Sequence, residues 1–209
     1  EAAQVFNRLC MAQVMEETHH LLVAPKCLQN KVLDFIEEEI CHADNNEPAY
    51  IGVKMNSLTD KTIIDKMVEA SQHGVKIDLV VRGICCLIPG IEGYTENIRV
   101  ISIVGRYLEH SRIYIFGTPE RDKMFISSAD FMTRNMVKRV EVATPIYDTA
   151  IKDRVRTMFG IMLHDTVKGR ELCRDGNYYR REKPQEESEV ISSQAYFSNE
   201  AYLAASKNV

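Results

Sequence analysis

The sequence predicts an α/β protein built on a mixed sheet of about seven strands, with helices flanking the sheet. Short apolar runs that are typical of buried strands alternate with longer segments whose apolar residues repeat at helical spacing. The segments that join them are short and contain glycine, proline and asparagine. Ligands of such sheets collect at the carboxyl ends of the strands, so we expect the functional residues there.

In the first part of the chain, apolar residues at helical spacing predict helices at residues 5–18, 28–41 and 60–72. Apolar runs predict strands at residues 20–24, 49–55 and 75–81. Thr59 or Asp60 is a suitable cap for the third helix, because a short polar side chain accepts a hydrogen bond from a free amide of the first turn. The third strand leads Arg82 into a loop that contains glycine and proline.

In the second part, apolar runs predict strands at residues 99–104, 113–116 and 139–144, a further strand that ends before residue 130, and a helix at residues 148–163. After this helix the composition becomes more charged and polar. We therefore expect a compact domain at residues 1–168 and a C-terminal tail at residues 169–209.

The tail admits two interpretations. Residues 170–183 are basic and include Tyr178 and Tyr179, and basic residues beside aromatic rings can bind a polyanion. The composition favours the other interpretation, a solvated segment that packs on a further domain or on a sister subunit. Residues 195–206 are compatible with a short helix.

Composition narrows the class of protein. The 209 residues are 45% hydrophobic and 27% charged, as in ordinary soluble proteins, and no apolar run approaches the roughly 20 residues of a membrane span. The net charge of -4 argues against nucleic-acid binding. The six cysteines lack zinc-type or disulfide-type spacing, which indicates reduced thiols in the cytoplasm. The first residue is Glu1 rather than methionine, so we expect an excised part of a longer protein.

Residues 104–130 are the stretch with the most chemistry. His110, Ser111 and Arg112 head an apolar run, a Gly-Thr-Pro turn follows, and a second run ends in Ser128 and Asp130. A histidine and an arginine two positions apart on a strand point to the same face. The predicted hairpin therefore brings an imidazole, a guanidinium, a hydroxyl and a carboxylate together, which suits a phosphate.

Three further polar residues stand at predicted strand ends: Lys54, Asn56 and Arg82. A guanidinium in a loop at such an end can hold a phosphate through two parallel hydrogen bonds. Arg82 could instead pair with an acid at the sheet edge, and Ser128 with Asp130 could be a simple turn or cap. The glycine-rich loops that bind nucleotides elsewhere are absent from the sequence, so side chains must bind any phosphate.

Three runs carry a family resemblance: KMNSLTDKTIIDKMVEASQHGVKIDLVVRGICCLIPG, ENIRVISIVGRYLEHSRIYIFG and ISSADFMTRN. Together they resemble the C-terminal region of the ATP-dependent bacterial polyphosphate kinase of the phosphohistidine type, over about residues 21–181. That family has a phospholipase D-like fold, in which two α/β halves each contribute a His-x-Lys and a Gly-Ser-x-Asn strand. In this sequence HSR and SSAD stand at these positions. Arginine thus replaces the lysine and aspartate replaces the asparagine, and both replacements look normal for the kinase family.

The resemblance implies reversible transfer of the terminal phosphoryl group of ATP to polyphosphate through a phosphohistidine. That histidine belongs to the preceding half of the family's proteins, and no matching Thr-His-x-Lys motif occurs here. The resemblance also places the Mg²⁺ ligands and the ATP-contacting domain upstream. It implies ATP, ADP and inorganic polyphosphate as ligands, the upstream domains as partners, and a homo-oligomer. We expect the isolated chain to be inactive.

By the same resemblance, His110 is the second histidine of the paired site and acts as proton donor or phosphate ligand. Arg82 matches an arginine that contacts nucleotide or polyphosphate. Arg112, Ser128 and Asp130 complete the site by position. Lys54 and Asn56 are weaker candidates for the path of the polyphosphate.

Two other functions remain open from the residues. One is a phospholipase D-type phosphodiesterase with His110 as nucleophile in a dimer, against which the Arg82 loop and the SSADFMTRN run argue. The other is a polyphosphate- or nucleotide-binding module without catalysis. Diester hydrolysis would identify the first, and binding without transfer the second.

Overall fold

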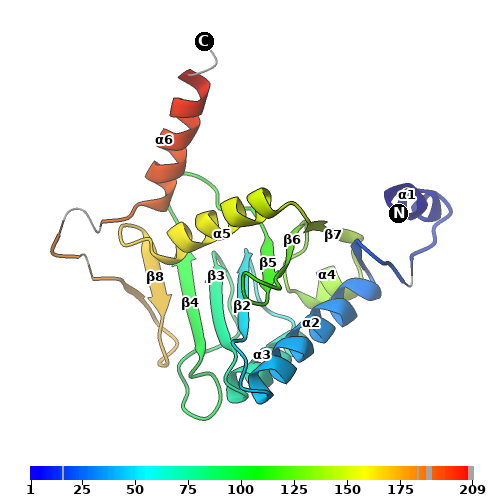
Figure 1. Cartoon of the computed structure of the whole chain (residues 1–209), viewed down its shortest axis with the longest axis horizontal. Coiled ribbons are helices and arrows are strands. Elements are labelled where there is room, and N and C mark those ends of the chain that lie inside the picture. Colours follow the sequence, from blue (N-terminus) through cyan, green and yellow to red (C-terminus); the bar gives the residue numbers. More distant parts are fainter. Residues whose placement is uncertain (16, 183, 187–189, 207–209) are drawn as a thin grey trace.

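A mixed sheet of nine strands forms the centre of the molecule, as the computed structural model shows for residues 1–209 except 16, 183, 187–189 and 207–209 (Figure 1). The strands are β1 (Leu22–Ala24), β2 (Tyr50–Met55), β3 (Lys76–Val81), β4 (Ile98–Ile103), β5 (Ile113–Phe116), β6 (Lys123–Ser127), β7 (Glu141–Ile146), β8 (Gly169–Leu172) and β9 (Tyr178–Arg180). Their order is β1-β7-β6-β5-β2-β3-β4-β8-β9. Strands β2, β3 and β4 are parallel and the other pairs antiparallel, which confirms the predicted mixed α/β sheet.

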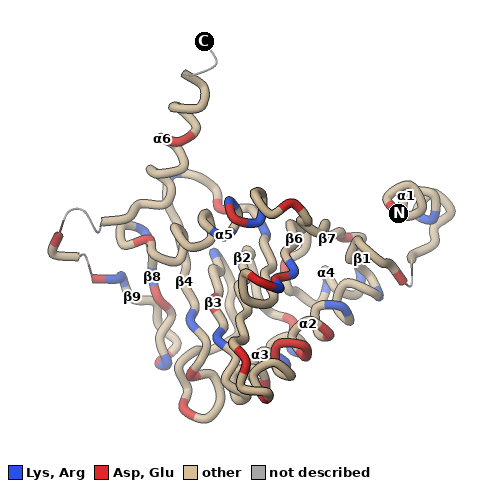
Figure 2. The backbone as a smooth tube through the Cα atoms, in the orientation of Figure 1, with Lys and Arg blue, Asp and Glu red and all other residues tan. Residues whose placement is uncertain are grey.

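Helices cover both faces of the sheet. They are α1 (Ala2–Cys10), α2 (Cys27–Asp44), α3 (Lys61–Gln72), α4 (Thr133–Val137), α5 (Thr149–Leu163) and α6 (Ser193–Ser206). Helices α2 and α3 lie on one face and α5 on the other, whereas α6 projects away from the body (Figure 1). Positively and negatively charged residues alternate with uncharged ones along the backbone of the body (Figure 2). No helix among the described residues is long and apolar enough to cross a membrane.

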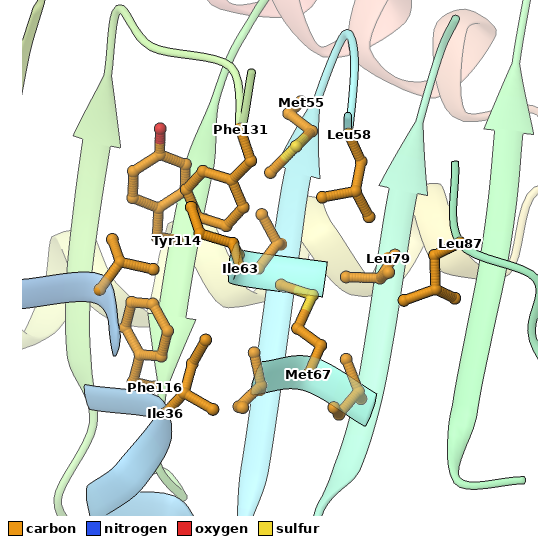
Figure 3. Close-up of a cluster of buried hydrophobic side chains, with 14 of the residues drawn as sticks. Ile36, Met55, Leu58, Ile63, Met67, Leu79, Leu87, Tyr114, Phe116 and Phe131 are labelled. Carbon is orange, nitrogen blue, oxygen red and sulfur yellow. The ribbon is translucent and has the colours of Figure 1, made fainter. Parts of the chain in front are cut away.

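The apolar periodicity of the sequence decides which side chains fill the two cores. In α2, Leu28, Val32, Ile36 and Ile40 recur every four residues and all are buried against the sheet. Figure 3 shows this core, in which Ile36 lies with side chains from α3 and from the strands β2, β3 and β5. The alternate residues of the strands face α5 in a second, smaller core.

Carboxylate caps fix the starts of two helices. Asp60 accepts a hydrogen bond from the amide of Ile63 at 3.1 Å, and Asp148 accepts one from the amide of Ile151 at 2.9 Å. Such caps satisfy amides that have no partner within the helix. The predicted starts of α3 and α5 therefore agree with the structure.

A close approach between α5 and the sheet requires glycine at position 52 of β2. A Cβ atom at Gly52 would lie 3.0 Å from Cε1 of Phe159 and 3.1 Å from Cε1 of Tyr50. These contacts are tighter than normal van der Waals packing. The missing side chain thus leaves room for Phe159 of α5 to pack closely on β2.

The structure differs from the sequence prediction in the extent of the sheet. Strand β8 pairs with β4, and β9 pairs with β8, so the sheet has nine strands and continues beyond the expected boundary at residue 168. These strands have only four and three residues, and Arg170, Glu171 and Arg180 lie within them. Short charged strands at an edge carry no apolar alternation, which is why the composition resembled that of a tail.

Two differences concern helices. Helix α1 ends at Cys10 rather than at the predicted residue 18. The backbone leaves the helical conformation directly after it, since Ala12 has a φ of 55°. Helix α4 was not expected, because five residues are too few for a clear periodicity. Strand β5 begins at Ile113, as predicted. His110 and Arg112 lie in the loop before it, so the alternation of a strand does not place them on a common face.

The outer edge of the sheet at β1 is covered by a thiol. The amide of Val23 donates to Cys27 Sγ at 3.2 Å, and the Cys27 thiol donates to the carbonyl oxygen of Val23 at 3.1 Å. Both backbone groups belong to the strand at one end of the sheet order. The buried Cys27 therefore occupies hydrogen-bonding groups that an edge strand usually leaves open.

Candidate functional site

The topology brings the predicted site residues to one end of the sheet. Strands β2 and β3 are parallel, so Asn56 and Arg82 follow them at the same end. Strand β5 is antiparallel to β2 and begins there, with Ile113 opposite Lys54. The hairpin returns through β6 to the same end, where the amide of Ser127 donates to the carbonyl oxygen of Arg112 at 3.1 Å.

Asp130 and Arg112 form the centre of this cluster. Arg112 donates from Nε to Asp130 Oδ1 at 3.2 Å and from Nη2 to Oδ2 at 3.0 Å. Burial acts to raise the pKa of Asp130, but the hydrogen bonds from Arg112 and from Asn56 outweigh it and hold this pKa below its usual value. The carboxylate is therefore charged and fixes the plane of the guanidinium.

His110 lies beside the same guanidinium. Nη1 of Arg112 is 3.1 Å from His110 Nδ1 and donates to the His110 carbonyl oxygen at 2.9 Å. Because arginine only donates hydrogen bonds, the first contact makes Nδ1 an acceptor and leaves the ring proton on Nε2. The ring is exposed, so Nε2 is available to donate that proton to an anion.

Asn56 acts on Asp130 from the other side. Its amide nitrogen donates to Oδ1 at 2.7 Å, and its side-chain Nδ2 donates to the same oxygen at 3.1 Å. Only 5% of the residue is exposed, and among the described residues nothing hydrogen-bonds to Oδ1 of Asn56. The structure thus gives Asn56 a buried contact with Asp130 rather than a place on the surface.

Lys54 is also buried, with 1% of its surface exposed. Its Nζ lies 3.3 Å from Glu109 Oε2 and donates to the carbonyl oxygen of Ser111 at 3.3 Å. Burial is the main cause that lowers the pKa of Lys54, Glu109 acts against it, and the charges of Arg82 and Arg112 add to the lowering. This ammonium group faces the protein, unlike the side chain expected along a polyphosphate path.

Of the cations in this cluster, Arg82 has the side chain that is least constrained by contacts. Its backbone is held, because the amide donates to the Met55 carbonyl oxygen at 3.2 Å and the carbonyl accepts from Ser102 Oγ at 3.0 Å. Its guanidinium makes no hydrogen bond or ion pair within the part of the chain that the structure describes. A partly exposed guanidinium without a carboxylate is suited to binding an anion.

Ser128 is directed away from this group. Its hydroxyl donates to the Glu141 carboxylate and accepts from the Val142 amide at 3.1 Å. Asn135 Nδ2 donates to the other Glu141 oxygen at 2.5 Å. The sequence analysis did not single out Glu141 or Asn135. No sequence pattern links them to Ser128, and the pairing of β6 with β7 brings them together.

Metal binding is not supported by these residues. Among the described residues, no group of three or more histidine, cysteine, aspartate or glutamate side chains could hold a metal ion.

Comparison with known proteins identifies the family. The family described as polyphosphate kinase C-terminal domain 2 matches residues 21–194. The chain belongs to this family. The polyphosphate kinase of Bacillus cereus is 51% identical over 179 residues, which are 86% of this chain and 26% of that protein. The polyphosphate kinase of Halalkalibacterium halodurans is 48% identical over 199 residues, 94% of this chain and 28% of that protein.

Solved structures agree with this polyphosphate kinase family. The structure of polyphosphate kinase from Porphyromonas gingivalis superimposes with a TM-score of 0.88 at 33% identity, over 99% of this chain and 31% of that chain. The phospholipase D family member Nuc from Salmonella typhimurium matches with a TM-score of 0.53 at 16% identity, over 73% of this chain and 96% of that one, which shows the fold alone. The resemblance and the phospholipase D-like fold are thus confirmed. The chain spans about a quarter of the relatives' length.

Proposed function

We propose that this chain supplies one half of a polyphosphate kinase active site, in a longer protein that transfers the terminal phosphoryl group of ATP reversibly to polyphosphate. The observation that carries the proposal is the cluster of His110, Arg112 and Arg82 at one sheet end, in a chain of this family. A transferring phosphoryl group is stabilised mainly by positioned positive charge and hydrogen-bond donors. Such a cluster provides both.

In this proposal the phosphoryl group passes from ATP to a histidine outside this chain, which releases ADP, and then to the terminal oxygen of polyphosphate. Splitting one transfer between two polyanions into two steps avoids bringing both together. His110 donates the Nε2 proton to a phosphate oxygen. Arg112, held by Asp130 and by His110, donates its remaining Nη2 hydrogen to a phosphoryl oxygen.

Arg82 binds a phosphate of the nucleotide or of the polymer through its free guanidinium. Asn56 supports Asp130, and Ser128 supports the turn through Glu141. ATP, ADP and inorganic polyphosphate are the proposed ligands. The upstream domains of the same polypeptide and further subunits of a homo-oligomer are the proposed partners, with Mg²⁺ bound upstream and the protein in the cytoplasm.

A labelling experiment tests the proposal. The full-length protein and this chain alone are incubated with γ-labelled ATP and magnesium, and label is followed on protein and in polymer. We expect polymer from the full-length protein and neither product from this chain alone. Label on this chain alone would contradict the assignment of the phosphohistidine to another segment, and hydrolysis of a phosphodiester would favour the phospholipase D-type alternative.

Variants of the full-length protein test the role of His110. His110→Ala should reduce polymer synthesis by at least about 100-fold, since general acid catalysis contributes about 10²–10⁴-fold. His73→Ala is the matched control, because His73 lies at the end of α3, at the opposite end of β3 from Arg82, and pairs with Asp44. Turnover of His110→Ala close to that of the control would remove His110 from the site.

A further inference from the structure

The segment that leads into His110 is held by the start of helix α6. Gln194 accepts a hydrogen bond from the Tyr107 amide through Oε1 at 3.0 Å and donates to the Tyr107 carbonyl oxygen through Nε2 at 2.8 Å. Its Nε2 also lies 2.9 Å from Glu109 Oε1, to which it donates. One buried side chain, 7% exposed, thus binds the backbone and an acid of this segment.

Glu109 connects this contact to the interior. Its second oxygen, Oε2, lies 3.3 Å from Nζ of Lys54, and that ammonium donates to the Ser111 carbonyl oxygen. The contacts therefore run from Gln194 through Glu109 and Lys54 to Ser111. Glu109 and Ser111, which these contacts bind, are the two neighbours of His110 in the sequence.

The start of α6 is itself fixed in place. Asp165, which is fully buried, accepts hydrogen bonds from the Ser193 amide at 2.8 Å and from the Ser193 hydroxyl at 2.6 Å. Its other oxygen accepts from the amides of residues 167–169. Gln194 follows Ser193 directly, so its position is tied to the body of the protein.

A glycine on the segment makes room for Gln194. A Cβ atom at Gly105 would lie 2.4 Å from Gln194 Oε1, so a side chain at this position would displace the amide group of Gln194. Residues 104–108 are all exposed, so little packing holds them. The two hydrogen bonds between Gln194 and the Tyr107 backbone, with the contact of the Tyr107 hydroxyl to Ser198, therefore hold this segment against α6.

The charges explain why the contacts act as a unit. Lys54 is close enough to Arg82 and Arg112 for their charges to lower its pKa, so the three cations repel one another. Glu109 is the carboxylate that pairs with Lys54, and only 14% of its side chain is exposed. Removing one partner of a buried pair leaves the other charge uncompensated, which is costly. The position of Glu109 therefore depends on both Lys54 and Gln194.

We infer that Gln194, Glu109 and Lys54 are positioning residues, which together place the His110 segment for phosphoryl transfer. The inference rests on the proposed function for its kinetic consequence. The first turn of α6, which is far from the site in sequence, would thus determine the geometry of the site through Gln194. Displacing a reacting group by about 1 Å can cost on the order of 100-fold in rate.

Gln194→Met in the full-length protein is the first test. Methionine has nearly the length of glutamine but makes none of its hydrogen bonds. We expect kcat for polymer synthesis to fall about 10- to 100-fold, while KM for ATP changes less than about two-fold. Glu200→Gln is the control, because it removes the contact of the same helix with Arg154 and leaves Gln194 in place. Equal effects of the two variants would overturn the inference.

The double variant Lys54→Met with Gln194→Met tests whether the residues act together. If they belong to one chain of contacts, the double variant loses no more than about two-fold beyond the larger single loss. Losses that multiply would show two independent effects and would contradict the inference.

Amide hydrogen exchange separates this inference from the proposed function. In Gln194→Met the Tyr107 amide should exchange at least about 10-fold faster than in the unmodified protein and in Glu200→Gln, because its acceptor is gone. If the unmodified protein makes no polymer, the proposed function fails, and the exchange result still decides the inference. Unchanged exchange at Tyr107 would overturn it in either case.

Discussion

The guanidinium of Arg112 and the carboxylate of Asp130 face each other across the open end of the β5–β6 hairpin through two parallel contacts, at 3.2 and 3.0 Å. The pair joins residues on either side of the hairpin. It leaves Nη1 of Arg112 to contact His110. The hairpin ends thus hold one another in the geometry that the site requires.

This pair predicts a pH-dependent stability. Asp130→Asn should lower the free energy of unfolding by about 2 kcal/mol at neutral pH, because it removes charge-assisted hydrogen bonds to Arg112 and Asn56. The folded-state pKa of Asp130 is lowered from 3.8, so its stabilisation is present above that value and is lost as the pH falls below it through the folded-state pKa. Urea denaturation at several pH values measures both effects.

The matched control for Asp130 is Asp65→Asn. Asp65 pairs with Lys61 on the exposed surface of α3, and such pairs contribute no more than about 1 kcal/mol. A difference between Asp130→Asn and the unmodified protein that stays constant down to acidic pH would contradict the role given to the ionised carboxylate.

Arg82→Ala should weaken the binding of polyphosphate by about 10- to 100-fold, since each charge-assisted contact contributes about 1.5–3 kcal/mol. Stability should change by less than about 0.5 kcal/mol, because the guanidinium contacts no carboxylate in the part of the chain described. Equilibrium binding of a labelled polyphosphate to the full-length protein measures the first effect. The control is Arg154→Ala, whose arginine pairs with Glu200 on the surface; equal losses would return Arg82 to a structural role.

Ser128→Ala distinguishes a structural hydroxyl from a phosphate ligand. The hydroxyl is bound to Glu141, so we expect a loss of about 1 kcal/mol in stability and a change of KM for ATP below about two-fold. A large rise in KM with unchanged stability would show instead that Ser128 contacts the substrate.

Tyr114→Phe tests the turn that presents Asp130. The Tyr114 hydroxyl lies 2.5 Å from the Ala129 carbonyl oxygen, to which it donates, and the ring packs on Phe131. Phenylalanine keeps the packing and loses the donor, so we expect about 1.5 kcal/mol of destabilisation by thermal or urea unfolding. The exposed Tyr202 on α6 provides the control, since Tyr202→Phe should change stability by less than about 0.5 kcal/mol. A similar result for both variants would contradict the prediction.

Local patterns were sufficient for most of the fold. The four-residue spacing from Leu28 to Ile40 and the cap at Asp60 reflect interactions within one helix turn or two, which a sequence shows directly. His110, Arg112 and Asp130 also come together through a local hairpin, so their grouping could be predicted. Their function stays a prediction.

Contacts that depend on distant pairing could not be predicted. Ser128 was expected among the phosphate ligands, but the register of β6 and β7 turns its hydroxyl to Glu141. Gln194 meets Tyr107 across 87 positions, with no apolar or charge pattern to mark the contact. Lys54 stands at a strand end as expected, yet only the position of Glu109 in space explains why its ammonium is buried.

The thiol that covers β1 limits how this protein can join another polypeptide. A strand from a second chain needs free amides and carbonyls along an edge, and Val23 offers neither, because Cys27 holds both. Pro25, which has no amide hydrogen, ends the strand immediately afterwards. The sheet therefore cannot be extended at this side by strand addition. In the proposed function, a second half that completes the site therefore reaches His110 without pairing with β1.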